Sequence, residues 1–209
     1  MASTDRLERA SPADSSNSEH RARRIGLFGG SFDPPHVAHV MAAAYALAVA
    51  RLDALWVLPC PEHPLGKDLT PWLHRFVMSR LAFSDLSRVV VSDLEQELGP
   101  PTRTLRTIEH MLGEDSEREI VLVVGGDILG ETHKWYGWKR IRELAEVLVI
   151  GRAGEGEGAA GCPSGLCLPA IASSDIRNRL RRGGAVDALV PARVLDYISR
   201  HGLYGVDRP

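Results

Sequence analysis

The segment IGLFGGSFDPPHVAH, residues 25–39, decides the fold of this chain. It opens with an apolar run typical of a strand, passes through two glycines and two prolines, and leads into an Ala-rich stretch that reaches about Ala50. We interpret it as a strand, a glycine turn and the start of a helix. In such a unit the free backbone N–H groups and the positive end of the helix dipole face the carboxyl end of the sheet, where they attract a phosphate.

The rest of the chain repeats this alternation. Further apolar runs of strand type stand at residues 55–58, 89–91, 120–124 and 147–150. Stretches of helical period separate them or follow them, among them residues 72–84, 176–182 and 192–200. Alternating strands and helices predict an α/β fold, a Rossmann-like parallel sheet with helices on both faces in a single domain.

Composition narrows the function classes. With 209 residues and 44% hydrophobic side chains, the chain is long enough for one domain with a proper core. Lys and Arg number 25 against 27 Asp and Glu, so the formal net charge of -2 provides no field for attracting nucleic acid or an anionic membrane. No apolar run reaches the roughly 20 residues of a membrane helix. We therefore expect neither nucleic acid nor membrane as a partner.

The N-terminal residues 1–23 are Ser-rich and charged, with almost no bulky apolar groups. We expect them to form a disordered extension before a domain that covers residues 24–209. They lack the apolar region of a secretory signal, so we expect a cytoplasmic protein. The three cysteines, Cys60, Cys162 and Cys167, show no C-x-x-C spacing, and we expect thiols rather than a disulfide framework or a zinc site.

Two histidines carry the expected chemistry. His36 and His39 are three residues apart, which places both on one face of the first helical turn, beside the predicted phosphate. Imidazoles there can donate hydrogen bonds to phosphoryl oxygens as charge grows in a transition state. The alternative is a pair of ordinary surface or capping histidines. A metal site is less favoured because no third ligand is apparent.

The motif G-G-S-F-D-P-P-H-x-x-H resembles the opening of the nucleotidyltransferase superfamily that carries H-x-G-H, and specifically of bacterial nicotinate mononucleotide adenylyltransferases. Four later segments are similar to that family in the same order. These are V-G-G-D at 124–127 followed by K-W-Y at 134–136, I-A-S-S-D-I-R at 171–177, and the ending at 189–204. The similarity runs from about residue 24 to residue 204.

The resemblance implies transfer of the adenylyl group of ATP to nicotinate mononucleotide, giving nicotinate adenine dinucleotide and pyrophosphate in NAD biosynthesis. Mg²⁺ is expected to arrive with ATP, and no metal bound by the protein itself is expected. Catalytic roles fall on His36, His39 and Arg177. The expected ATP-binding residues are Phe28, Gly29, Gly30, Ser31, Phe32, Gly125, Asp127, Ser173 and Ser174, and the expected acceptor-binding residues are Thr104, Trp135, Tyr136 and Lys67.

Several of these residues also have a local interpretation. Ser173 and Ser174 stand where a helix N-cap belongs, and Arg177 follows one turn later with a forked charge suited to pyrophosphate. Asp127 follows the strand at 120–124, where its carboxylate could accept from ribose hydroxyls. An indole such as Trp135 can stack on a pyridine ring. The alternatives are a capped surface helix, a plain turn, and aromatic side chains that anchor a helix to the core, which fits Trp138 better.

Three departures from the family pattern stand out. Ala38 replaces the glycine of H-x-G-H, and we expect a small repositioning of the adenine rather than loss of activity. Arg103 and Arg106 occupy the Tyr and Asp positions of S-Y-T-x-D-T-L, where their charge could favour an acidic substrate or simply be solvated. The P-P-H-K/R loop is only partly matched at residues 61–67, so the assignment of His63 and Lys67 is loose.

Other functions remain open at this point. The same chemistry could act on nicotinamide mononucleotide or another phosphorylated acceptor, although Trp135 and Tyr136 favour a pyridine. A regulatory module could bind the nucleotide without turnover. Nucleic-acid binding is disfavoured because the basic residues Arg179, Arg181 and Arg182 lack interleaved aromatic side chains.

Overall fold

The centre of the fold is a six-stranded sheet in the order β3-β2-β1-β4-β5-β6, in which every neighbouring pair is parallel. The computed structural model describes residues 23–62, 68–126, 130, 134–152 and 167–207. The strands are β1 (Arg24–Gly30), β2 (Ala54–Pro59), β3 (Val89–Val91), β4 (Glu119–Gly125), β5 (Ala145–Arg152) and β6 (Cys167–Leu168). The order of the strands along the sheet reverses between β1 and β4, and open α/β sheets bind ligands at such a switch point.

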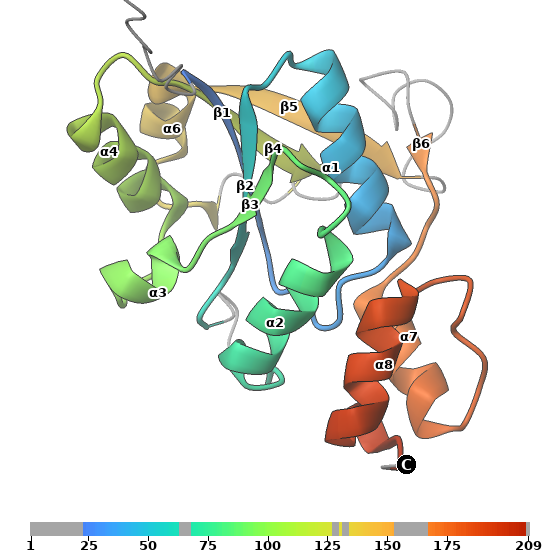
Figure 1. Cartoon of the computed structure of the whole chain (residues 1–209). Coiled ribbons are helices and arrows are strands. Elements are labelled where there is room, and N and C mark those ends of the chain that lie inside the picture. Colours follow the sequence, from blue (N-terminus) through green and yellow to red (C-terminus); the bar gives the residue numbers. More distant parts are fainter. Residues whose placement is uncertain (1–22, 63–67, 127–129, 131–133, 153–166, 208–209) are drawn as a thin grey trace, which may run out of the picture.

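Helices cover both faces of the sheet, as Figure 1 shows. On one face lie α1 (Val37–Val49) and α2 (Trp72–Ala82), and on the other lie α3 (Leu94–Leu98), α4 (Thr104–Glu114) and α6 (Trp138–Leu144). The alternation of β4 explains the two cores: Val121 and Val123 enter one hydrophobic cluster, and Leu122 enters the other. The predicted α/β architecture in a single domain is confirmed.

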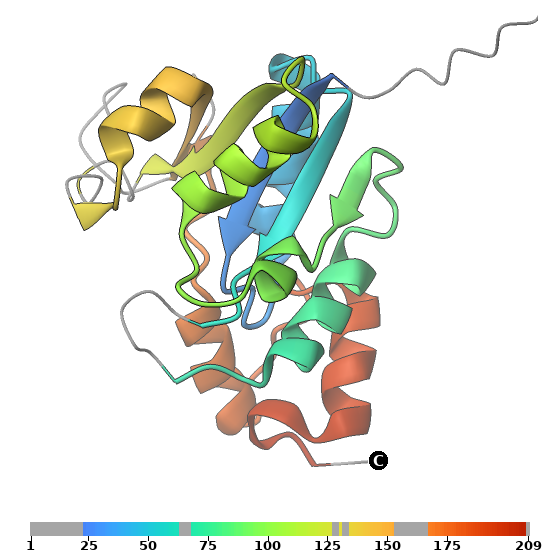
Figure 2. The same ribbon diagram turned by 90° about the vertical axis from the view of Figure 1, so that its left-hand side faces the viewer.

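The C-terminal elements α7 (Ser173–Arg181), α8 (Ala192–His201) and the 3₁₀ turn η3 (Leu203–Gly205) lie beyond the carboxyl end of β1 (Figure 2). They hold the start of α1 by hydrogen bonds. The backbone N–H of Val37 donates to the carbonyl of Leu189 at 2.9 Å, and the Ser173 hydroxyl donates to the carbonyl of Pro34 at 2.9 Å. The end of the chain therefore contributes to the edge of the sheet where ligands bind.

The five predicted strands are all present and extend up to two residues beyond the apolar runs, except β3, which matches its run. The short elements β6 and α3 were not predicted, because two and five residues are too few to show a period. Residues 1–22 of the predicted extension lie outside the described residues. Among the described helices, none is both long and apolar enough to cross a membrane.

The expectation that the cysteines are thiols holds for Cys60, which is free, and is wrong for Cys167, which is disulfide-bonded. Spacing alone did not reveal this bond, because a single disulfide needs no C-x-x-C motif or repeated framework. The bonding partner of Cys167 lies outside the described residues.

Candidate active site

The segment that joins β1 to α1 forms the floor of the site. Gly29 and Gly30 are the last residues of β1, paired with Leu58 and Pro59, so the predicted glycine turn is wrong. The chain turns afterwards, at Phe32, whose φ is +46°. A Cβ at Gly29 would meet no atom within 4 Å, whereas one at Gly30 would come within 3.0 Å of the Phe32 ring. Gly29 thus leaves its backbone open to a ligand, and Gly30 makes room for Phe32.

His36 and His39 come together as predicted, though not in one helical turn. His36 is the N-cap of α1, with extended backbone (φ -140°, ψ 172°), and His39 is the third helical residue. Their rings stack with centroids 3.7 Å apart and an interplanar angle of 24°. His36 is buried and His39 is partly exposed.

The backbone N–H of His36 donates to His39 Nδ1 at 3.2 Å. Because Nδ1 is an acceptor in this bond, a neutral His39 carries its proton on Nε2. The neutral His39 ring therefore carries its N–H donor at Nε2, the outer nitrogen relative to the backbone, and an N–H is the kind of group that binds a phosphoryl oxygen.

A pocket opens beside the two histidines at the switch point of the sheet. Its lining combines polar groups of the α1 start with apolar side chains and the end of β4, namely Phe28, His36, Ala38, His39, Ala42, Val123, Val124, Gly125, Ile150 and Leu168. The methyl group of Ala38 lies in this lining, which is where the sequence comparison placed the change from glycine. An apolar pocket next to hydrogen-bond donors suits a flat base attached to a phosphate.

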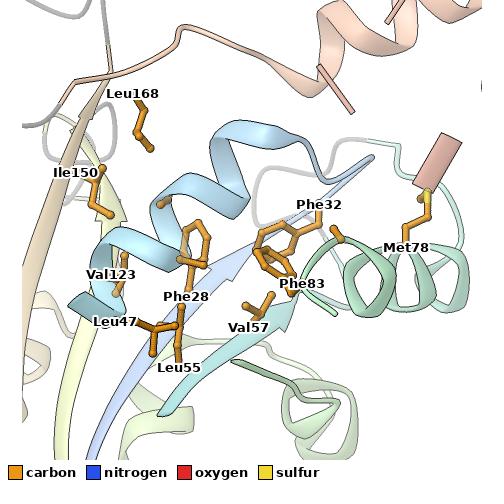
Figure 3. Close-up of a cluster of buried hydrophobic side chains, with 14 of the residues drawn as sticks. Phe28, Phe32, Leu47, Leu55, Val57, Met78, Phe83, Val123, Ile150 and Leu168 are labelled. Carbon is orange, nitrogen blue, oxygen red and sulfur yellow. The ribbon is translucent and has the colours of Figure 1, made fainter. Parts of the chain in front are cut away.

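Phe32 contributes to the site through contact with His39. Its ring is buried and meets the His39 ring edge to face at a centroid distance of 4.9 Å, and it also contacts Phe28 and Phe83. Figure 3 shows these three phenylalanines in the cluster under α1. The side chain of Phe32 thus orients His39, and only its backbone could reach the predicted ATP.

Arg177 lies within reach of the same loop. Its Nη1 donates to the carbonyl oxygen of Asp33 at 2.5 Å, and its side chain is 24% exposed. The helix that carries it begins at Ser173, with Ala172 as N-cap, so the predicted N-cap role of Ser173 and Ser174 is wrong. The hydroxyl of Ser173 instead donates to the loop at Pro34, and Ser174 is exposed. Sequence reasoning placed the cap one or two residues late because Ser outranks Ala in N-cap preference.

Asp33 supports the loop before His36, and it stands in the quoted motif without having been singled out as a site residue. Its buried carboxylate accepts a hydrogen bond of 2.6 Å from the Tyr204 hydroxyl and one of 3.2 Å from the backbone N–H of Thr70, and Arg177 Nη1 is 3.9 Å away. Burial and the Asp33 carboxylate raise the pKa of Tyr204, so its hydroxyl stays a donor. The signal that could have identified Asp33 in the sequence was an acidic residue between the apolar residues Phe32 and Pro34, because a carboxylate that is buried there needs hydrogen-bond partners.

Arg75 is a second side chain that supports the site and that was not identified from the sequence. It is 1% exposed, and its guanidinium donates to the carbonyls of Thr70, Ser31 and Pro61 at 2.8, 2.8 and 3.1 Å. It ties the loop after β1 to the loop after β2 and to the start of α2. Nothing in the helical period of α2 distinguishes this arginine from a surface one. Cys60 lies nearby, and burial raises the pKa of its thiol.

The predicted acceptor residues gather on the other face of the sheet. Thr104 is the first residue of α4, and Trp135 meets Trp138 edge to face at a centroid distance of 5.7 Å. Tyr136 is 63% exposed, with the Arg103 guanidinium carbon 3.9 Å from its ring centroid. Both tryptophans also pack against the second core cluster, so the anchoring interpretation holds for Trp135 as well as Trp138. Asp127, His63 and Lys67 lie outside the described residues.

A buried carboxyl lies near the start of α4. Glu95 of α3 is buried, and the Thr107 hydroxyl lies 3.5 Å from its Oε1. Burial raises the pKa of Glu95 to about 7, while the contact with Thr107 partly opposes the shift. In the part of the chain that the structure describes, no group of three or more His, Cys, Asp and Glu side chains could hold a metal ion.

Comparison with known proteins agrees with this geometry. Residues 27–179 match the cytidylyltransferase-like family. A probable nicotinate-nucleotide adenylyltransferase of Anaeromyxobacter sp. (strain K) is 48% identical over 185 residues, which cover 87% of this chain and 97% of the relative. Another protein of that name from Myxococcus xanthus (strain DK1622) is 38% identical over 189 residues, which cover 90% and 97%.

Among solved structures, the Plasmodium falciparum nicotinic acid mononucleotide adenylyltransferase complexed with NaAD superposes with a TM-score of 0.74. It is 20% identical, and the match covers 88% of this chain and 98% of that one. This likeness concerns the fold. With a pocket at the switch point and relatives matched over nearly their whole length, the chain belongs to the cytidylyltransferase-like family and, within it, to the nicotinate-nucleotide adenylyltransferases.

Proposed function

We propose that this protein transfers the adenylyl group of ATP to nicotinate mononucleotide and releases pyrophosphate. The observation that carries the proposal is the stacked pair of His36 and His39 in the pocket between β1 and β4, with the bare backbone of Gly29 at the end of β1. The names of the relatives support the choice of acceptor. The resulting dinucleotide would serve NAD biosynthesis.

The reaction is a direct displacement at the α-phosphorus of ATP. A phosphate oxygen of the acceptor forms a bond to this phosphorus while the bond to the bridging oxygen of the β-phosphate breaks, and pyrophosphate leaves with the electron pair. The attacking phosphate is already anionic, so no side-chain nucleophile is needed. Catalysis then depends on alignment and on charge stabilisation.

Each side chain has a role that follows from its position. The outer N–H of His39 and the ring of His36 would bind the α-phosphate and the bridging oxygen. Arg177 donates one N–H to the Asp33 carbonyl, and other donors of its guanidinium would bind the departing pyrophosphate. Ser31, whose carbonyl is held by Arg75, would present its hydroxyl or N–H to an adjoining phosphate.

The adenine and the pyridine would occupy opposite sides of this phosphate centre. We place the adenine in the pocket that Ala38 and Phe28 line, and the pyridine near Thr104, Trp135 and Tyr136. Roles for Asp127 at the ribose and Lys67 at the acceptor phosphate stay predictions. Mg²⁺ would enter as Mg-ATP, held mainly by phosphate oxygens and water; the Asp33 carboxylate, three residues before His36, is already engaged by Tyr204 and Thr70.

The test is pyrophosphate release from Mg-ATP with nicotinate mononucleotide and, in parallel, with nicotinamide mononucleotide, compared as kcat/KM. The proposal requires a marked preference for the acid. Equal rates with both would make the acceptor assignment wrong while leaving adenylyl transfer intact. Binding of ATP without any release of pyrophosphate would favour a regulatory module.

A further inference from the structure

Arg103 lies beside two of the predicted acceptor-binding residues, Thr104 and Tyr136. It is the N-cap residue of α4, with an extended backbone, and its side chain is exposed. The guanidinium carbon lies 3.9 Å from the centroid of the Tyr136 ring, which is itself 63% exposed. Among the described residues, no hydrogen bond or ion pair occupies the donors of this guanidinium. An arginine on a surface aromatic ring thus keeps its N–H groups available in the plane of the group.

The contact between Arg103 and Tyr136 is built into the packing of two elements. A Cβ at Gly137 would come within 2.4 Å of Leu105 Cδ2, so the segment before α6 lies directly against the first turn of α4. The Trp135 ring is held on the same segment by Trp138. Arg103 therefore contacts Tyr136 where these two elements pack together, and Trp135 is the residue next to Tyr136 in the chain.

The local charge is positive around this contact. The first turn of α4 contains no acidic residue, and no side chain caps it, so its free N–H groups add a partial positive charge. The acids of α4 itself, Glu109 and Glu114, lie beyond its first turn, and Glu95 beside Thr107 is buried, with a raised pKa that keeps much of it neutral near pH 7. A ligand group at this place would experience the Arg103 charge with little local opposition.

Arg106 on the same helix differs from Arg103 in its contacts. It lies one turn further along α4 and is equally exposed, but its Nη1 donates to the carbonyl of Gly99 at 2.9 Å. This bond turns the guanidinium back toward the loop before α4. The two arginines that depart from the family pattern therefore differ in placement, and only Arg103 lies on Tyr136.

We propose that Arg103 is a specificity-determining residue that binds the ring carboxylate of the acceptor through the guanidinium held on Tyr136. The proposal rests on the proposed function and adds a residue that the family pattern does not provide, because the family has Tyr at this position. A guanidinium forms forked, charge-assisted hydrogen bonds with a carboxylate. A neutral carboxamide forms weaker ones, and its NH₂ group faces like donors.

The experiment compares kcat/KM for nicotinate and nicotinamide mononucleotides in the wild-type chain, Arg103→Gln, Arg103→Lys and Arg106→Gln. For Arg103→Gln we expect kcat/KM with the acid to fall by about 10- to 100-fold through KM, the size of one or two charge-assisted bonds. The value with the amide and the KM for ATP should stay within about threefold. Arg103→Lys should retain part of the preference, and Arg106→Gln all of it.

The comparison of the wild-type protein with its variants separates the proposed function from the proposed role of Arg103. The wild-type protein alone tests the proposed acceptor, and a lack of acid preference there overturns both that assignment and the role of Arg103. If the wild-type protein prefers the acid and Arg103→Gln keeps the same preference, the inference is wrong and the proposed function stands. Equal losses with both nucleotides would also overturn it, since they indicate a structural role; thermal melting of each variant checks that the fold is intact.

Discussion

The hydroxyl of Tyr204 donates a hydrogen bond of 2.6 Å to the carboxylate of Asp33, across 171 residues of sequence. The same aspartate offers its carbonyl to Arg177, and it lies three residues before His36. The C-terminal turn, the proposed pyrophosphate-binding arginine and the histidine segment therefore share one buried anchor. Loss of the anchor should affect both the stability of the fold and the alignment of the site.

Replacing Tyr204 by Phe tests this anchor. The buried Asp33 carboxylate would lose one of its partners, and we expect the free energy of unfolding to fall by about 1–3 kcal/mol. Urea denaturation followed by tryptophan fluorescence measures it. Tyr197→Phe is the matched control, because the Tyr197 hydroxyl meets His74 Nδ1 at 2.9 Å at a partly exposed position and its loss should matter less. Equal effects of the two substitutions would contradict a special role for the Asp33 contact.

Removal of the His39 ring should slow turnover. If its outer N–H stabilises the charge that develops on the transferred phosphoryl group, His39→Ala should lower kcat by about 100-fold or more. Single-turnover measurement of pyrophosphate release would report the chemical step. His110→Ala is the control, since His110 is exposed on α4 and lies 3.6 Å from Glu114. Near-normal turnover of His39→Ala would remove this residue from the mechanism.

Trp135 is expected to act on binding rather than on chemistry. Trp135→Ala removes the proposed stacking surface and should raise the KM for the pyridine nucleotide by about tenfold, with a smaller change in kcat. Steady-state kinetics at saturating ATP would show the split. The control is Trp56→Phe on β2, which keeps an aromatic side chain at a partly buried position of the same core. An unchanged KM would leave Trp135 with its anchoring role alone.

The raised pKa of Glu95 should make the stability of the fold depend on pH. Its pKa of about 7 in the folded protein is raised above the ordinary value of 4.5, so the folded state binds the proton more tightly. Stability should therefore fall as the pH rises from about 4.5 to 7, by about 3 kcal/mol in total. Glu95→Gln should be more stable than the wild-type chain at pH 8 and similar to it at pH 5. Chemical denaturation at both values, with the exposed Glu97→Gln as control, measures the difference, and identical pH profiles of wild type and Glu95→Gln would contradict it.

The sequence was informative where a feature is local. The apolar runs predicted five strands because a buried parallel strand shows itself in consecutive residues, and the pair His36 and His39 was found from its spacing. The two side chains do lie together although the helix begins one residue later than His36, because stacking needs only closeness across the helix start. Their phosphate-binding role stays a prediction.

Features that depend on distant partners were not predictable. Asp33 and Tyr204 were both visible in quoted motifs, but no periodicity joins residues 33 and 204. The burial of Arg75 follows from the meeting of three loops whose carbonyls need donors, and a helix pattern does not reveal it. Likewise, Arg103 and Arg106 are alike in sequence and differ only in what the packing places beside them.

The hydrogen bond from Val37 N–H to the Leu189 carbonyl, together with the Tyr204 contact, has a consequence for biosynthesis. A nascent chain that has released only its first 180 residues from the ribosome holds both histidines and all six strands, yet it lacks the groups that fix the histidine segment. Such an intermediate can pair the strands and form the cluster under α4, but it lacks Val186, Val190, Val194 and Ile198 of the cluster that includes α1. We therefore expect activity to appear only after Tyr204 has emerged and docked on Asp33, and a chain stalled before that point to be inactive.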